Sequence, residues 1–204
     1  MGICLQSKDI VVAGRFNPYI ITPQWLAEQG VCAIDGDFEL EFAFAVEARK
    51  AIVHFVADGV KWHVTDSRLT LSTTDPTRDP SAIAVAVMEK LPHTPVSAVG
   101  NNFHFKCDRR DWSGGHSQLN GKGFEELRAY GEPISISWSS LLQQSGVRVQ
   151  IKFEESADHI EVHTNHHRDA GNCAQACQAA REFQSDFEKS KQLVLSITGN
   201  EVSQ

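Results

Sequence analysis

The sequence of 204 residues lacks several features that would identify a functional class at once. No apolar run approaches the roughly 20 residues needed to span a bilayer, so we expect no membrane partner. The first residues, MGICLQSKDIVVAG, contain neither the basic region nor the long apolar region of a secretory signal. The nucleophile-elbow, P-loop, zincin and dinucleotide-binding motifs are absent, which removes the enzyme classes that these motifs identify.

Cysteines and basic residues are also sparse. The five cysteines are an odd number at irregular spacing, so they predict reduced thiols in the cytoplasm rather than a disulfide framework. The net charge of -7 argues against a nucleic-acid partner, because phosphate binding needs a concentrated basic patch. With 41% hydrophobic and 22% charged residues, the composition is typical of a folded globular protein, and the length predicts a single domain over residues 1–204.

What is present is a repeated alternation of apolar and polar residues, the period of a strand with one buried face. FELEFAFAV (38–46) and VRVQIKF (147–153) have it most clearly. Asp58-Gly59 between two such runs predicts a hairpin turn, because both central positions favour positive φ. The predicted strands are 38–46, 51–57, 60–64, 68–72, 95–107, 134–138, 147–153, 159–163 and 193–197.

Helical signals follow the strands. Asp79 caps a predicted helix that starts at Pro80, and Ile83, Val87 and Leu91 recur in it at helical spacing. Thr22 and Pro23 start a short helix in the same way. Further predictions are a loop at 108–123, a short helix at 124–130 and a long helix at about 170–190.

The two halves of the chain, about 38–107 and 134–199, have the same order of parts: hairpin, helix, strand. This order predicts an internal pseudo-repeat, although the two halves share few identical residues. The predicted fold class is therefore α+β, with antiparallel sheet meanders and helices packed on one face.

The helix at 170–190 carries two cysteines, Cys173 and Cys177, four residues apart. Residues one turn apart on a helix rarely reach disulfide geometry, so redox pairing is not expected. Free cysteine is a small and often buried side chain, which favours packing against the sheet. The predicted buried stripe comprises Cys173, Cys177, Ala180, Phe183 or Gln184, and Phe187.

Three histidines, His163, His166 and His167, precede this helix in HTNHHRDAGNCAQAC. Imidazole nitrogens and thiolates are zinc ligands, so the stretch raises the hypothesis of a metal site. The spacing instead favours the polar end of a strand that leads into a helix. A metal protein stays the third hypothesis, and no cofactor is predicted.

A second candidate site lies in NNFHFKCDRRDW (101–112). Amide, imidazole and guanidinium groups stand there next to a glycine-rich loop, where binding sites often occur. On a strand, however, His104 shares a face with Asn102, which is an ordinary solvent face. Gly100 predicts either a bulge or a close approach to the backbone. The candidate ligand-binding residues are Asn101, Asn102, His104, Arg109 and Arg110.

The order of VAGRFNPYIITPQWL, WHVTDSRLTL and PVSAVGNNFHF, followed by a strand pair and a long helix, resembles a group of sporadically distributed bacterial proteins. The layout of that group is similar to that of the export chaperone SecB. The resemblance implies an α+β fold and oligomers, and it brings no catalytic residues.

Two functional hypotheses follow. The first is a cytoplasmic, non-enzymatic protein-interaction module that self-associates through sheet edges or exposed aromatic residues, because the edges of antiparallel strands must be covered. The second is an enzyme or small-ligand-binding protein with its site at Asn102, His104 and the loop 108–123.

Overall fold

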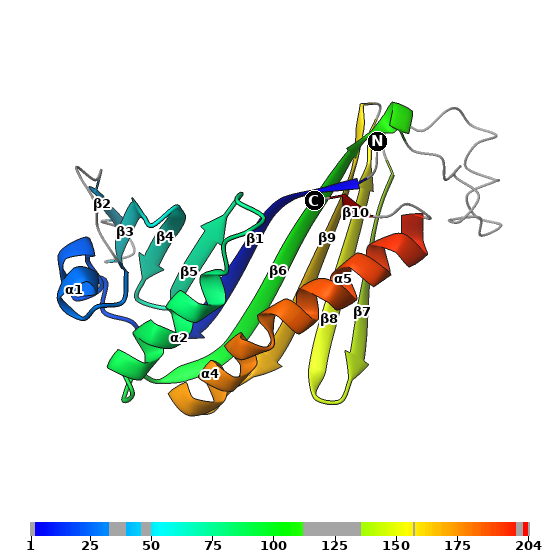
Figure 1. The fold of residues 1–204 in the computed structure, drawn as a ribbon. Coiled ribbons are helices and arrows are strands. Elements are labelled where there is room, and N and C mark those ends of the chain that lie inside the picture. The colour runs from blue at the N-terminus through cyan, green and yellow to red at the C-terminus, as the bar shows by residue number, and fades with distance from the viewer. Residues whose placement is uncertain are drawn as a thin grey trace.

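The computed structural model describes residues 3–32, 40–45, 50–111, 136–156, 158–198 and 202–203. Within these residues the chain forms one twisted sheet and four α-helices (Figure 1). The predicted helix at 124–130 and nearly all of the predicted loop at 108–123 lie outside the described residues.

The first part of the sheet is a meander that follows a long strand, β1 (Ile3–Gly14). The short helix α1 (Pro23–Glu28) comes next, and Thr22 caps it as predicted. The predicted hairpin turn is confirmed, since Asp58 and Gly59 have φ values of 50° and 69°. Four strands make the meander: β2 (Leu40–Ala45), β3 (Lys50–Ala57), β4 (Val60–Thr65) and β5 (Arg68–Thr73).

The helix α2 (Pro80–Lys90) begins where the sequence predicts. The Asp79 carboxylate accepts a hydrogen bond of 2.8 Å from the backbone N–H of Ser81. The buried face of α2 is rotated by about one position from the predicted face. The buried residues are Ala84, Val87 and Met88. Ile83 and Leu91 are only partly buried at its border. After the helix come β6 (Val96–Asp108) and a single 3₁₀ turn, η1 (Arg109–Asp111).

Three further strands form the second meander: β7 (Ile136–Gln144), β8 (Val147–Glu155) and β9 (His159–Asp169). The β7–β8 turn has two residues, Ser145 and Gly146, with φ of 50° and 80°. Strand β9 continues six residues beyond the predicted end at 163. All three histidines of the candidate metal site therefore lie within this strand.

The C-terminal helix is divided in two. Helix α4 (Cys173–Arg181) starts after its cap, Asn172, and α5 (Phe183–Thr198) follows a break at Glu182. The prediction of a strand at 193–197 is wrong, because these residues belong to α5. Leu193, Leu195 and Ile197 alternate like a strand, but the buried residues of the region recur at helical steps. These are Phe183, Phe187, Ser190, Val194 and Thr198.

The sheet has ten strands in the order β2-β3-β4-β5-β1-β6-β9-β8-β7, and β10 (Val202–Ser203) pairs with β1. All pairings are antiparallel except β1–β10, which is parallel. The predicted α+β class is confirmed. The strand that was to close the second pseudo-repeat unit is helical instead, so the repeat of a hairpin followed by a helix stays a prediction.

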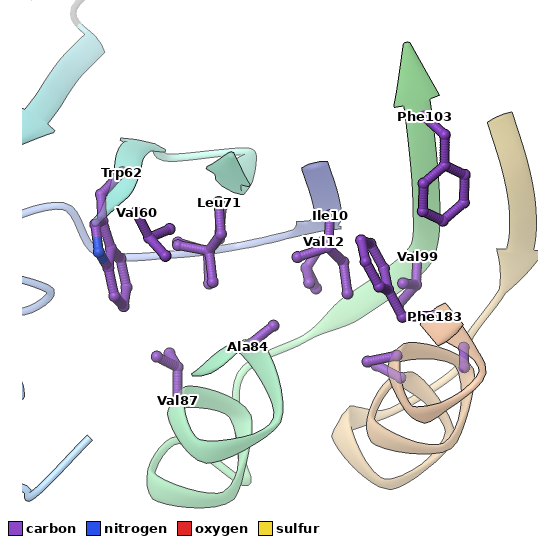
Figure 2. Packing of buried hydrophobic residues seen from close by; sticks show 14 of the residues in the cluster. Ile10, Val12, Val60, Trp62, Leu71, Ala84, Val87, Val99, Phe103 and Phe183 are labelled. Carbon is purple, nitrogen blue, oxygen red and sulfur yellow. The ribbon is translucent and has the colours of Figure 1, made fainter. Parts of the chain in front are cut away.

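Helices α2, α4 and α5 lie across one face of the sheet, and the core fills the space between the two layers (Figure 1). Figure 2 shows Trp62, Val60 and Leu71 of the sheet pointing toward α2. Each fully buried side chain of this size contributes about 1.5–3 kcal/mol of burial free energy. The other face of the sheet, which we call the open face, lies away from these three helices. The helix-covered face therefore carries the hydrophobic core of the described residues.

Candidate functional site

Strand β9 sends polar side chains to both faces of the sheet. Thr164, His166 and Arg168 point toward the helices, and their neighbours His163 and Asn165 point to the open face. The register gives each set its own partners on β6: His166 lies opposite Asn101, and His163 lies opposite His104. Because successive residues of a strand alternate between faces, two polar clusters arise back to back on one strand.

The first, the buried cluster, lies between β9, β6 and α5 and centres on the carboxylate of Asp186. Arg168 donates two hydrogen bonds to this carboxylate, of 2.5 and 2.7 Å. Asn101 donates a third, of 2.8 Å. Asp186 is 0% exposed, so the charge-assisted bidentate pair with Arg168 is what makes its burial tolerable. The members are Asn101, Thr164, His166, Arg168, Asp186 and Ser190.

The same cluster contains the residue types of a Ser-His-Asp triad. Nε2 of His166 is 2.8 Å from the Ser190 hydroxyl, and its Nδ1 is 3.5 Å from Asp186. Thr164 donates to the same hydroxyl at 2.8 Å. Burial lowers the pKa of His166, which favours the neutral ring. Ser190 is 0% exposed, so no substrate reaches its oxygen in this arrangement, and the group acts as a hydrogen-bond network.

The second, the open cluster, comprises Asp9, Asn102, His104, His163 and Asn165 on the open face. The Asp9 carboxylate accepts a hydrogen bond of 2.7 Å from Asn102 and lies 3.4 Å from Nε2 of His104. The rings of His104 and His163 stack, with centroids 4.1 Å apart. Burial, and next the neighbouring His104, lower the pKa of His163 to about 4. His163 is therefore neutral at physiological pH.

Two atoms of the open cluster have no hydrogen-bond partner among the described residues: Nε2 of His163 and Oδ1 of Asn165. Both are shielded from solvent, where an unpaired polar atom costs free energy. The Asn165 amide lies over Gly100, with Oδ1 3.5 Å from the position that a Cβ would take. The register of β6 shifts elsewhere, so Gly100 is not at a bulge, and a Cβ there would meet the Asn165 amide at ordinary van der Waals distance.

Histidines gather on the open face. His54 and His63 form a second cross-strand pair, with ring centroids 4.2 Å apart. Of the nine histidines in the chain, six lie on this face by the strand register. They are His54, His63, His104, His159, His163 and His167. The imidazole groups of the described strands are therefore concentrated on one side of the sheet.

The predicted ligand-binding residues do not converge. Asn102 and His104 belong to the open cluster, whereas Asn101 faces α5 on the other side of the sheet. Arg109 forms an ion pair with Glu155 at 2.8 Å. Arg110 forms one with Asp108 at 2.9 Å, beyond the polar cluster at the end of β6. Of the predicted set, only Asn102 and His104 act together.

The three candidate metal ligands also divide between the two faces. His166 is in the buried cluster, while His163 and His167 are on the open face, and His167 lies 3.2 Å from Asp169. Within the described parts of the chain, no three His, Cys, Asp or Glu side chains are placed to hold a metal ion. Both Cys173 and Cys177 are buried on the predicted stripe, and burial raises the pKa of each thiol.

Two open hollows among the described residues have linings that do not include the open cluster. One, of about 720 Å³, is lined by Arg15, Asp66, Ser67 and Ser97, among others. The other, of about 340 Å³, lies where the β7–β8 turn meets α4. The open cluster is therefore outside these two hollows.

The partners Asp9 and Asp186 were missed by sequence reasoning. Both pair with residues more than 80 positions away, so no local pattern points to them. A signal was available for Asp186, because it stands next to Phe187 and three residues after Phe183 on the predicted buried stripe. A carboxylate at such a position requires a buried cation.

No family model matches the chain, and no curated protein matches it. The resemblance to a SecB-like group therefore stays a prediction. None of the helices in the described residues has the length and apolar character needed to cross a membrane.

Proposed function

We propose that this chain is a cytoplasmic, non-enzymatic interaction module that works by self-association. The observation that carries the proposal is the edge of the sheet at β7. Among the described residues, β7 pairs with β8 alone, and all nine of its residues are in that ladder. The opposite side of β7 presents backbone N–H and C=O groups without a described partner, and such an edge is a template for another strand.

The composition of β7 supports this use of the edge. Natural edge strands are commonly protected by charges, prolines or bulges. The sequence of β7, ISWSSLLQQ, has none of these, whereas every other strand longer than two residues contains a charged residue. Leu141 and Leu142 are 68% and 46% exposed. Apolar exposure on an unprotected edge favours association with protein rather than permanent contact with water.

The buried polar cluster supports a non-catalytic role. The hydroxyl of Ser190 is sealed between α5 and β9, where no substrate reaches it in this arrangement. Catalytic and ligand sites are usually concave pockets that a substrate can enter. The net charge of -7 also favours a protein partner over nucleic acid.

The test is the mass of the tag-free protein in solution. We expect light scattering to give twice the chain mass of 22.6 kDa, with dissociation on dilution. The series should run from about 100 μM to about 1 μM, so that a transient dimer is detected. A monomer at every concentration would contradict the proposal.

A second candidate function is binding of a small polar molecule at the open cluster. The unpaired Nε2 of His163 and Oδ1 of Asn165 favour it, because a ligand with a donor and an acceptor could satisfy both. Titration with simple amides and alcohols, followed by NMR of the histidine rings, tests this candidate. Shifts that saturate at His163 and vanish in Asn165→Ala would support it, and unchanged spectra would exclude these ligand classes.

A further inference from the structure

We infer that the partner of β7 is the same strand of a second copy, paired antiparallel across a two-fold axis that passes by Ser140. The inference rests on the proposed self-association and specifies its strand, its symmetry and its register. It would produce one continuous sheet through two chains. The charge, the length and the hydrogen-bond pattern of β7 each favour this pairing.

The absence of charge selects a second copy as the occupant. When a strand pairs antiparallel with its own copy across a two-fold axis, a charged residue near the axis lies close to the same charge of the second copy, which is unfavourable. Strand β7 has no charged residue, so self-pairing carries no such penalty. The strand at the other end of the sheet, β2, contains Glu41. Of the two end strands, β7 is therefore better suited to self-pairing.

The direction of pairing follows from symmetry. A dimer of identical chains forms most readily with a two-fold axis, where the same patch contacts itself. For two edge strands, an axis perpendicular to the sheet makes the strands antiparallel and keeps the helix-covered faces on the same side. Leu141 and Leu142 point to opposite faces, so each face of the junction gains one exposed leucine from each copy.

The two-residue turn determines which backbone groups point outward. In such a hairpin the residues that flank the turn form a hydrogen-bonded pair, here Gln144 and Val147. Every second residue before Gln144 then directs its backbone groups to β8. The alternate residues direct theirs to the open edge, and these are Ser137, Ser139, Leu141 and Gln143.

The length of the strand determines the register. A two-fold axis at Ser140, the middle of Ile136–Gln144, places all nine residues opposite a partner. Leu141 then lies opposite Ser139 of the second copy, and both have outward backbone groups, as a hydrogen-bonded pair requires. An axis at Ser139 or Leu141 leaves two residues of each described strand without a partner. The centred register is therefore the longest.

The sharpest test is a cysteine on the axis. Ser140 would face Ser140 of the second copy in a non-hydrogen-bonded pair, with Cα atoms about 4.5 Å apart, which is within disulfide range. We expect Ser140→Cys to form covalent dimers under mild oxidation. The matched control is Ser139→Cys, whose thiols would be diagonal neighbours about 7–8 Å apart and should cross-link far less. Both variants carry Cys4→Ser and Cys32→Ser, because these native cysteines are not fully buried.

A second test weakens the junction. Leu141→Lys places like charges near the axis, and we expect it to raise the dissociation constant of the dimer at least about tenfold. Leu141 is 68% exposed, so the fold should tolerate lysine, which circular dichroism can check. The matched control is Val56→Lys, since Val56 is 53% exposed on β3, an interior strand of the sheet, and should leave the mass unchanged.

The outcomes separate the two proposals. Selective cross-linking of Ser140→Cys, together with dissociation of Leu141→Lys, would support pairing through β7. A dimer that Leu141→Lys does not weaken, or equal cross-linking of both cysteine variants, would overturn the β7 register while self-association stands. A parent protein that is monomeric at every concentration would overturn the proposed self-association itself.

Discussion

The two polar clusters on β9 use similar side chains in opposite ways. His163 and His166 are three residues apart on one strand, yet one lies on the open face and the other beneath α5. In the buried cluster Arg168 balances Asp186, and the Ser190 hydroxyl lies 2.8 Å from Nε2 of His166, while Oδ1 of Asn101 stays unpaired. In the open cluster, two polar atoms stay unpaired.

This difference teaches how burial constrains a polar group. A charge beneath a helix must be neutralised and hydrogen-bonded, because water is not there to solvate it. An unpaired neutral atom costs less than an unpaired charge, so each cluster tolerates one or two of them. The buried cluster is therefore expected to stabilise the fold, and the open cluster is free to respond to pH or to a ligand.

The largest expected effect is from removal of the central carboxylate. Asp186→Ala leaves the Arg168 guanidinium nearly buried without its partner, which should lower the free energy of unfolding by about 3–5 kcal/mol. Urea denaturation measures the change. The matched control is Asp169→Ala, which removes exposed contacts to Arg148 and His167 and should cost less than about 1 kcal/mol. An equal loss of unfolding free energy in the two variants would show that the buried carboxylate stabilises the fold no more than the exposed one.

An intermediate effect is expected from pH. The folded-state pKa of His163 is about 4, below its usual 6.5, so the unfolded chain binds the proton more readily. Stability is thus full above about pH 6.5 and falls as pH decreases toward 4. After allowance for partial solvation of the ring, the loss from pH 7 to pH 5 should be about 1–2 kcal/mol.

His163→Gln should flatten the pH dependence of stability measured by urea denaturation at the two pH values. The matched control is His93→Gln in the exposed turn after α2, which should retain the steeper dependence of the parent protein. Burial also lowers the pKa values of His63 and His166, so some dependence should persist in His163→Gln. An unchanged slope would show that His163 is protonated in the folded protein at pH 5.

The smallest effect is expected in the open cluster itself. His104 has a 43% exposed side chain, and its contact with Asp9 is 3.4 Å long. His104→Ala should therefore lower the free energy of unfolding by less than about 1 kcal/mol. Calorimetry of this variant beside Asp186→Ala gives a direct comparison of the two faces. A loss of 3 kcal/mol or more, on the order expected for a buried pair, would contradict the assignment of the open cluster to solvent.

Sequence patterns predicted the local elements better than their long-range partners. The alternation in 147–153 and the Asp79-Pro80 start of α2 were sufficient, because strand period and helix caps are local properties. The run at 193–197 misled, since five residues with strand alternation can also extend a helical stripe. Strand alternation was sufficient to place Asn101 and Asn102 on opposite faces of the sheet. The role of Asp186 was not predictable in this way, because it depends on how α5 lies over β9.

The carboxylate of Asp186 also has an evolutionary consequence. It connects β6, β9 and α5 through Asn101 and Arg168, three positions that local sequence does not relate. Loss of one charge leaves the other buried without a partner, so substitutions at Arg168 and Asp186 should occur together or not at all. Homologues can share too little overall identity to be recognised by it. In such chains, the three positions should be kept together or exchanged together. This coordinated change would mark common descent longer than any contiguous motif.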